Sequence, residues 1–286
     1  MAEQEKLLIA HSAAQLKAAA RSWREAGQRL ALVPTMGALH GAHMALIERA
    51  QGLAERTMVS IFVNPKQFGP GEDFEKYPRP QEQDLRLLRQ AAVDLVFMPS
   101  IEQMFPPDFA SDLKAGPLAE PLCGRHRPGH FDGVVTLVAE LFRQTEPDLA
   151  VFGEKDFQQL QIIRRLVESE NSPIEIVAAP LVRDPDGLAV SSRNAYLSDK
   201  QRRQALNLSG TLSLLSARAA EGQPLRELER VGMAALGKAG LEVEYLEFRH
   251  EHDLELAENL LRPLRLFAAA RVGPTRLIDN MPVPTA

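Results

Sequence analysis

Two histidines three residues apart, His40 and His43, lie where an apolar run gives way to a helical pattern. The run at residues 30–33 is typical of a buried strand, and apolar positions recur with a helical period over residues 42–53. A helix N-terminus has unpaired N–H groups and partial positive charge, so a strand–turn–helix junction is a natural anion site. Side chains three apart share one side of the first turn. The spacing therefore predicts a phosphate site that both histidines face.

Three further polar clusters follow predicted strands or lie just beyond the last one. They are residues 64–68 (Asn-Pro-Lys-Gln-Phe), 153–156 (Gly-Glu-Lys-Asp) and 190–194 (Val-Ser-Ser-Arg-Asn). Any one of these residues alone is more often an ordinary solvated side chain. Because a doubly wound sheet collects its ligand groups at the carboxyl ends of its strands, the shared position of the clusters favours a ligand site.

The side chains in these clusters suit a phosphorylated ligand and a small acid. Lys155 can place a positive charge against a phosphate at a helix start. Ser191, Ser192 and Arg193 offer hydroxyl and guanidinium donors for a polyphosphate. Gln67 has both a carbonyl and an amide, so it can orient a hydroxyl together with a carboxylate or an amine.

The elements that position these clusters alternate between strand and helix from residue 30 to residue 179. Strands are predicted at 30–33, 57–63, 93–97, 148–152 and 174–178, and helices at 13–26, from 42, at 81–91, at 134–144 and from 156. The alternation predicts an α/β fold, a Rossmann-like parallel sheet with helices on both faces. Pro34 should end the first of these strands, because proline cannot continue a central strand. Residues 64–80 and 99–132 are rich in proline and glycine and are expected to be irregular.

After Pro180 the pattern changes. A capping box at Ser198 and Gln201 precedes a helix to about residue 220, and a second helix and three strands follow at 225–238, 241–249, 264–271 and 275–278. Helices followed by strands predict a smaller α+β domain. We expect two domains, residues 1–179 and residues 180–286.

The bulk composition is that of an ordinary globular protein, with 286 residues, 45% hydrophobic and 25% charged. A net charge of −5 argues against a general nucleic-acid surface. The single cysteine, Cys123, permits no intramolecular disulfide. The sequence shows neither a secretion signal nor an apolar stretch of ~20 residues that would span a bilayer. A soluble, cytoplasmic protein without a nucleic-acid or membrane partner is therefore expected.

Six segments in chain order carry a resemblance to a known family. They are PTMGALHGAH (34–43), FVNPKQF (62–68), Tyr77-Pro78-Arg79, RPGHFDGV (127–134), FGEKDFQQL (152–160) and DGLAVSSRN (186–194). Together they resemble the pantothenate synthetases, or pantoate–β-alanine ligases, of the HIGH-motif nucleotidyltransferase superfamily. The resemblance implies a Rossmann-like domain for ATP and pantoate and a smaller C-terminal lid domain.

The resemblance also implies roles for individual residues. The ATP site would comprise Met36, Gly37, Ala38, Leu39, His40, Gly41, Ala42, His43, Gly153, Glu154, Lys155, Asp156, Val182, Val190, Ser191, Ser192 and Arg193. Catalysis would rest on His43, His40, Lys155, Ser191, Ser192 and Arg193, with His43 as the usual proton donor. Gln67 would contact pantoate and later β-alanine, and Gln159 would contact pantoate. The protein itself would supply no metal ligands, because Mg²⁺ would arrive largely held by ATP, and a homodimer is implied.

This sequence departs from the family at two positions. Ala42 stands where the family's H-x-G-H motif has glycine, with Gly41 before it, and Val190 stands where methionine is common. Neither change removes a titratable group.

The reaction that the resemblance implies is a two-step ligation through pantoyl adenylate, with release of pyrophosphate and then AMP. The residues alone leave two alternatives open. One is a nucleotidyltransferase that stops at a nucleotidyl product, and the other is a nucleotide-binding module without catalytic activity.

Overall fold

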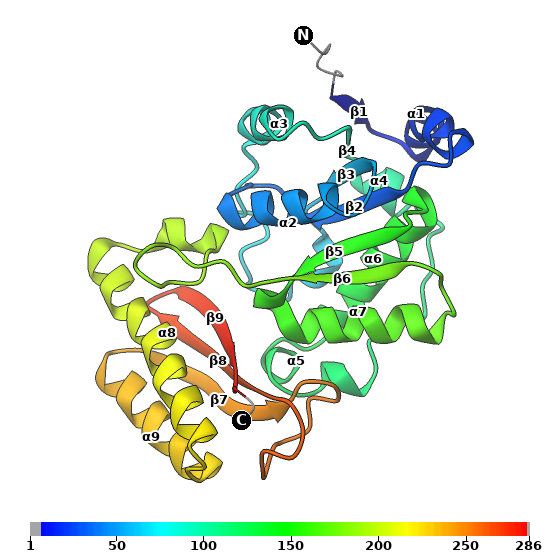
Figure 1. Ribbon diagram of the computed structural model, residues 1–286. Coiled ribbons are helices and arrows are strands. Elements are labelled where there is room, and N and C mark those ends of the chain that lie inside the picture. Colours follow the sequence, from blue (N-terminus) through cyan, green and yellow to red (C-terminus); the bar gives the residue numbers. More distant parts are fainter. Residues whose placement is uncertain (1–6, 285–286) are drawn as a thin grey trace. The chain divides into compact units, whose positions relative to one another are not determined.

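The computed structural model describes residues 7–284 and divides into two compact units (Figure 1). Unit 1 comprises the chain up to Pro117 together with Arg127–Glu154 and Ile162–Pro180. Unit 2 comprises Leu118–His126, Lys155–Gln161 and the chain from Leu181 onward. Two short segments that precede Pro180 in the sequence therefore belong with the C-terminal residues.

Unit 1 is built on a six-stranded parallel sheet in the order β1-β4-β3-β2-β5-β6. The strands are β1 (Leu8–Ala10), β2 (Leu30–Thr35), β3 (Arg56–Ile61), β4 (Leu95–Phe97), β5 (Leu149–Gly153) and β6 (Glu175–Ala179). From β2 the chain first adds strands on one side, then returns to add β5 and β6 on the other. The order reverses at β2 and β5, and the crevice beside the carboxyl ends of such a pair is where ligands bind.

Helices flank this sheet, which confirms the predicted α/β class. They are α1 (Ala13–Glu25), α2 (Gly41–Gln51), α3 (Gln81–Gln90), α4 (Ile101–Met104), α6 (His130–Thr145) and α7 (Phe157–Ser169). Ala31 and Val33 of β2 pack in one core with Ile47 and Ala50 of α2, and Figure 1 shows α2 lying across β2 and β5. Successive strand residues alternate between faces, so Leu32 is buried against the opposite side.

The prediction that Pro34 ends its strand is wrong, because β2 continues through Thr35 and Pro34 is in register with Ser60 of β3. The N–H of Asp148 donates to the carbonyl of Leu30, so by alternation Pro34 also faces the β5 side. The pairing with β5 covers only Ala31 and Leu32. Pro34, which has no N–H to donate, therefore lies beyond the last paired residue of β2 and β5.

The prediction that residues 99–132 are irregular is also wrong in part. The helices α4 and α5 (Cys123–His126) lie within it, and α6 begins at His130, four residues before the predicted start at Val134. Gly129 adopts a left-handed φ of +79° just before the helix, and Gly133 lies in its first turn. These glycines made a helical turn look like a loop. Residues 64–80 contain one short 3₁₀ turn, Pro65–Gln67, and the three-residue strand β1 was not predicted.

Unit 2 contains a three-stranded antiparallel sheet, β7 (Glu242–His250), β8 (Leu264–Val272) and β9 (Thr275–Pro282). Its helices α8 (Asp199–Ala220) and α9 (Leu225–Lys238) lie side by side (Figure 1). The predicted capping box is confirmed: the Gln201 N–H donates to Ser198 Oγ at 3.3 Å, and the Ser198 N–H donates to Gln201 Oε1 at 2.9 Å. The predicted α+β arrangement is therefore present. Among residues 7–284, no helix is both long enough and apolar enough to span a bilayer.

Candidate active site

The turn between β2 and α2 is shaped by a buried carboxylate on a different element, Asp84 of α3. Asp84 is 1% exposed, and its two oxygens accept the N–H groups of Ala38 at 2.9 Å and Leu39 at 2.8 Å. Burial raises the pKa of Asp84, and the two N–H donors oppose that rise. Gly37 has a φ of +78°, and a Cβ there would lie 3.0 Å from Asp84 Oδ2. The sequence offered one missed signal, an acid on the buried stripe of α3 beside Leu88.

The two histidines of the junction lie together, as their spacing predicted. His40 precedes α2 as its N-cap residue, and its ring centroid lies 4.1 Å from that of His43. The His40 N–H donates to His43 Nδ1 at 3.2 Å. Because that nitrogen accepts a hydrogen bond, the neutral His43 ring carries its proton on Nε2. His43 is thereby prepared as a hydrogen-bond donor through Nε2.

The amide groups of this junction are not equally available to an anion. The N–H of Gly37 donates to Thr35 Oγ1, and those of residues 38–40 go to Asp84 and His43. The N–H groups of Gly41 and Ala42, which open α2, have no acceptor within residues 7–284. A Cβ at Gly41 would meet open space. Among the main-chain groups of this junction, the first helical amides are therefore the ones open to an acceptor, and the preceding turn serves as their support.

Gln67 lies at the end of the 3₁₀ turn after β3 and is oriented by Asn64, which is fully buried. The amide of Asn64 donates to the Gly133 carbonyl at 2.9 Å, and its oxygen accepts the Lys66 N–H at 3.1 Å, so its orientation is fixed by main chain. Asn64 then donates to Gln67 Oε1 at 3.2 Å.

The outward-facing group of Gln67 is consequently its NH₂. Gln67 Nε2 lies 3.0 Å from the sulfur of Met36, a weak acceptor. A ligand oxygen would therefore displace the Met36 contact at little cost. Met36 and Gln67, predicted on separate grounds, are brought together in unit 1.

Lys155 lies in the 3₁₀ turn Glu154–Asp156 that joins β5 to α7. Its ammonium lies 3.7 Å from Asp156, and its side chain is 23% exposed. The Lys155 main-chain carbonyl accepts a hydrogen bond from the Asn280 side chain of β9 at 3.0 Å. The backbone of this turn is thus held independently of the lysine side chain. Gly153 and Glu154, at the end of β5, belong to unit 1.

The segment containing Val182 and Val190 forms a short hairpin in unit 2. The Val190 N–H donates to the Val182 carbonyl at 3.0 Å, and Arg183 makes a two-point ion pair with Asp279 at 2.7 and 2.9 Å. Arg202 of α8 binds the hairpin tip through Asp184 and Asp186. The hairpin is therefore tied to β9, as is the turn at Lys155.

The serines and arginine of the fourth cluster follow this hairpin directly. Ser191 caps the 3₁₀ turn Ser192–Tyr196, with its Oγ accepting the Arg193 N–H at 3.3 Å. The Asn194 side chain donates to the Ala189 carbonyl at 3.0 Å, which joins the turn to the hairpin. The side chains of Ser191, Ser192 and Arg193 are partly exposed. Lys155, Val182, Val190 and these three residues are thus linked through β9 and the hairpin within unit 2.

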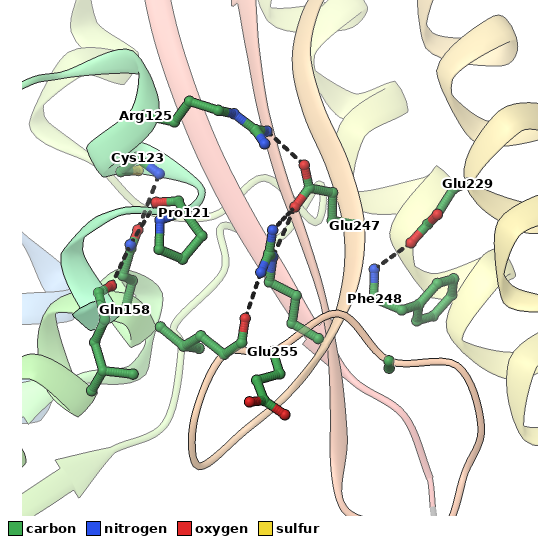
Figure 2. A network of polar contacts seen from close by, with 12 residues as sticks. Pro121, Cys123, Arg125, Gln158, Glu229, Glu247, Phe248 and Glu255 are labelled. Carbon is green, nitrogen blue, oxygen red and sulfur yellow. Dashed lines mark hydrogen bonds and ion pairs between the residues drawn. The ribbon is translucent and has the colours of Figure 1, made fainter.

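The adjacent glutamines at the start of α7 differ in environment. Gln158 is buried, donates to the carbonyls of Leu118 at 2.9 Å and Pro121 at 2.7 Å, and accepts the Cys123 N–H at 3.0 Å (Figure 2). The segment it holds is further tied to β7 by Arg125, whose guanidinium lies 2.6 Å from Glu247 (Figure 2). Gln159 is partly exposed. Within residues 7–284 its side chain makes no such hydrogen bonds.

This difference predicts opposite effects on stability. Gln158→Ala leaves two carbonyls and one N–H without their buried partner, so we expect the free energy of unfolding to fall by about 2–3 kcal/mol. Gln159→Ala, the matched control, should change it by less than ~0.5 kcal/mol. Urea titrations of both variants measure this. Equal losses in both variants would contradict the assignment of Gln158 to structure and Gln159 to ligand.

Comparisons with known proteins identify the family of this chain. The family model for pantoate-beta-alanine ligase matches residues 8–282. The pantothenate synthetase of Pseudomonas entomophila is 48% identical over 93% of this chain and 94% of the relative, and that of Paramagnetospirillum magneticum is 46% identical over 96% and 97%.

Solved structures give the same answer. The crystal structure of pantothenate synthetase from Thermus thermophilus superposes with a TM-score of 0.91 at 42% identity, covering 97% of this chain and 99% of that one. A pantoate-beta-alanine ligase from Francisella tularensis, complexed with beta-gamma ATP and beta-alanine, gives a TM-score of 0.82 at 32% identity over 98% and 99%. With its fold and nearly its whole length matched, this chain belongs to the pantoate–β-alanine ligase family.

Proposed function

We propose that this enzyme joins pantoate and β-alanine at the expense of ATP, through pantoyl adenylate. The observation that carries the proposal is the family match over residues 8–282, combined with a helix start that offers N–H donors and a half-buried glutamine oriented by Asn64. The family match also disfavours a nucleotidyltransferase that stops at a nucleotidyl product, because such an enzyme transfers no acyl group to an amine.

In the first step an oxygen of the pantoate carboxylate attacks the α-phosphorus of ATP, and the bond from that phosphorus to the bridging oxygen breaks. Pyrophosphate leaves with the electron pair. The carboxylate is ionised at neutral pH, so this step needs positioning and charge neutralisation more than a base. Donors aimed at the phosphates include the N–H groups of Gly41 and Ala42, His40, and His43 through Nε2. The remaining donors are Lys155, Ser191, Ser192 and Arg193.

In the second step the amine of β-alanine attacks the acyl carbon of the adenylate. The carbon–oxygen bond to the phosphate breaks, AMP leaves, and the new amide nitrogen loses a proton to solvent. The adenylate is activated toward water as well, so the site must exclude it. We assign ATP and pantoate to residues 1–179 and assign a lid role to residues 180–286, with the hairpin 182–190 moving as one tied piece.

The glutamines complete the acid site in this scheme. Gln67 would donate its NH₂ to an oxygen of pantoate and later contact β-alanine, and Gln159 would contact pantoate. Val182 and Val190 would pack on the nucleotide, where Val190 in place of methionine keeps an apolar surface. Ala42 adds a methyl that the usual glycine lacks, and the open space at Gly41 supplies clearance beside it.

Mg²⁺ is part of the proposal as an ion that enters with ATP. Within residues 7–284 no group of three or more His, Cys, Asp or Glu side chains is placed to hold a metal ion. The cationic and N–H donors of the site fit a nucleotide whose phosphates supply most of the metal's oxygen ligands. The ion would neutralise phosphate charge. A homodimer and a cytoplasmic location are also proposed, the first checked by the mass in solution.

Asp84 gives this scheme a test outside the reacting groups. In Asp84→Asn the amide oxygen can accept one of the two N–H groups at residues 38 and 39, but its NH₂ then faces the other donor. We expect the free energy of unfolding to fall by about 1–3 kcal/mol and the KM for ATP to rise. Glu82→Gln, an exposed acid in the same helix, is the matched control. Indistinguishable Tm and KM values for the two variants would contradict the supporting role of Asp84.

The reaction is tested by isotope exchange and product release. We expect exchange of labelled pyrophosphate into ATP only when pantoate is present, and AMP release at a steady rate only after β-alanine is added. Exchange without pantoate would show that a group other than pantoate accepts the adenylyl moiety, and would contradict the proposal. ATP binding without exchange or AMP formation would leave a nucleotide-binding module.

A further inference from the structure

We infer that Arg127 and His130 are positioning residues that act through Gln67, an inference that rests on the proposed function. Both belong to the RPGHFDGV segment, which has no other role in the scheme above. His130 opens α6, and its Nδ1 lies 2.7 Å from the main-chain carbonyl of Gln67. Arg127 Nη2 approaches the same carbonyl at 3.4 Å. One side chain just before α6 and one at its first residue thus hold the backbone of Gln67, the glutamine assigned to the substrate.

The partners of the two ring nitrogens determine the tautomer of His130. A carbonyl oxygen only accepts, so Nδ1 must carry the proton. A guanidinium only donates, and Arg127 Nη1 lies 2.9 Å from His130 Nε2, so that nitrogen must be the acceptor. The neutral ring with its proton on Nδ1 satisfies both partners at once.

Arg127 is itself held in place by Glu72. The pair is bidentate, with Nε 2.7 Å from Oε1 and Nη2 2.6 Å from Oε2, and both side chains are mostly shielded from solvent. Burial raises the pKa of Glu72, but the hydrogen bonds and charge of Arg127 outweigh it, so the pKa lies below its usual value. Glu72 therefore stays ionised and balances the guanidinium. The fork geometry fixes the third arm of Arg127 toward His130.

A close backbone approach places α6 directly on the turn that carries Gln67. A Cβ at Gly133 would lie 2.1 Å from the Lys66 carbonyl oxygen and 2.7 Å from the Gln67 amide nitrogen. Only glycine permits this approach, which also brings the Gly133 carbonyl to Asn64. The first turn of α6 thus controls both the main chain of Gln67 and, through Asn64, its side-chain orientation.

A double-mutant cycle tests whether His130 acts through Gln67. We expect His130→Ala to lower kcat/KM for pantoate about tenfold, the value of a lost positioning hydrogen bond, with little change in the KM for ATP. In the Gln67→Ala background the same change should cost less than twofold, because the group it positions is gone. His130→Asn can still donate to the Gln67 carbonyl and should recover much of the loss.

Several results would overturn the inference: equal losses in both backgrounds, no loss in either, or a loss that falls on the KM for ATP instead. If His130→Ala does not fold, the same double-mutant cycle is run with Arg127→Lys in its place. This variant keeps the positive charge beside Glu72 and removes the guanidinium arm that reaches His130. Wild-type enzyme that makes no pantothenate would refute the proposed function. An active wild type with an additive cycle would refute only the positioning role.

Discussion

Replacing His43 by alanine is expected to lower the rate of pantoyl adenylate formation at least ~10²-fold, because the variant loses a donor to the phosphate charge that grows in the transition state. The fold should remain, since the His43 ring accepts the His40 N–H and packs against the His40 ring, both within the same turn. The measurement is a single-turnover assay with enzyme in excess, in which adenylate is quenched and counted before β-alanine is added.

Two conservative variants separate the two ring nitrogens of His43. Asparagine can accept the His40 N–H at the Nδ1 position but has no donor further out. Glutamine can place an N–H near the Nε2 position. If Nε2 serves the phosphates, His43→Gln should retain more adenylation activity than His43→Asn. The reverse order would show that His43 matters as a cap of α2, and near-normal adenylation in His43→Ala would refute its role altogether.

Replacing Lys155 by alanine is the second change with a large expected effect, again at least ~10²-fold on adenylation. The ammonium is a point charge carried by the 3₁₀ turn Glu154–Asp156, which follows β5 in the chain. Its loss should cost little stability, because its partner Asp156 is half exposed and a surface ion pair is worth about 0–1 kcal/mol. The carbonyl of residue 155 still accepts from Asn280 in the variant. The same single-turnover assay measures the rate.

Asp156→Asn is the matched control for Lys155→Ala, because it breaks the same ion pair and leaves the lysine charge in place. We expect its adenylation rate to stay within a fewfold of wild type. Similar large losses in both variants would assign the effect to the ion pair. Near-normal adenylate formation in Lys155→Ala would remove Lys155 from the catalytic set.

The sheet was predictable because its central strands are short buried apolar runs separated by helical patterns. Two kinds of feature could not be predicted: a very short edge strand, and a strand end that depends on residues far along the chain. The strand β1 has only three residues, with Leu8 and Ile9 partly exposed at an edge, and its partner β4 lies far along the chain. Pro34 could not be placed without knowing that the β5 ladder stops short of it.

The candidate site divides in the same way. His40, His43, Gln67 and Lys155 were recognisable because each follows a strand and has a side chain suited to phosphate or carboxylate. The groups that hold them in place were not recognisable, since they come from other elements. Asp84 lies 46 residues from Ala38, whose N–H it accepts, and His130 lies 63 residues from Gln67. Such contacts follow from the fold and leave little trace in local spacing.

Gln158 and Gln159 show the limit most clearly. They are the same residue type in adjacent positions of one motif, yet one is buried with three main-chain partners and the other is partly exposed. They differ only in their position around α7, which places the Gln158 side chain against the segment 118–123. The family resemblance pointed to Gln159, and the hydrogen bonds supply the physical reason why Gln158 does a different task.

The most direct test of the central claim is a crystal structure with a non-hydrolysable ATP analogue and pantoate bound. We expect phosphate oxygens within hydrogen-bond distance, about 2.7–3.2 Å, of His43 Nε2 and of the first amides of α2. The NH₂ of Gln67 should meet a pantoate oxygen in place of the Met36 sulfur. A nucleotide seated elsewhere, with the start of α2 in contact only with solvent, would contradict the account.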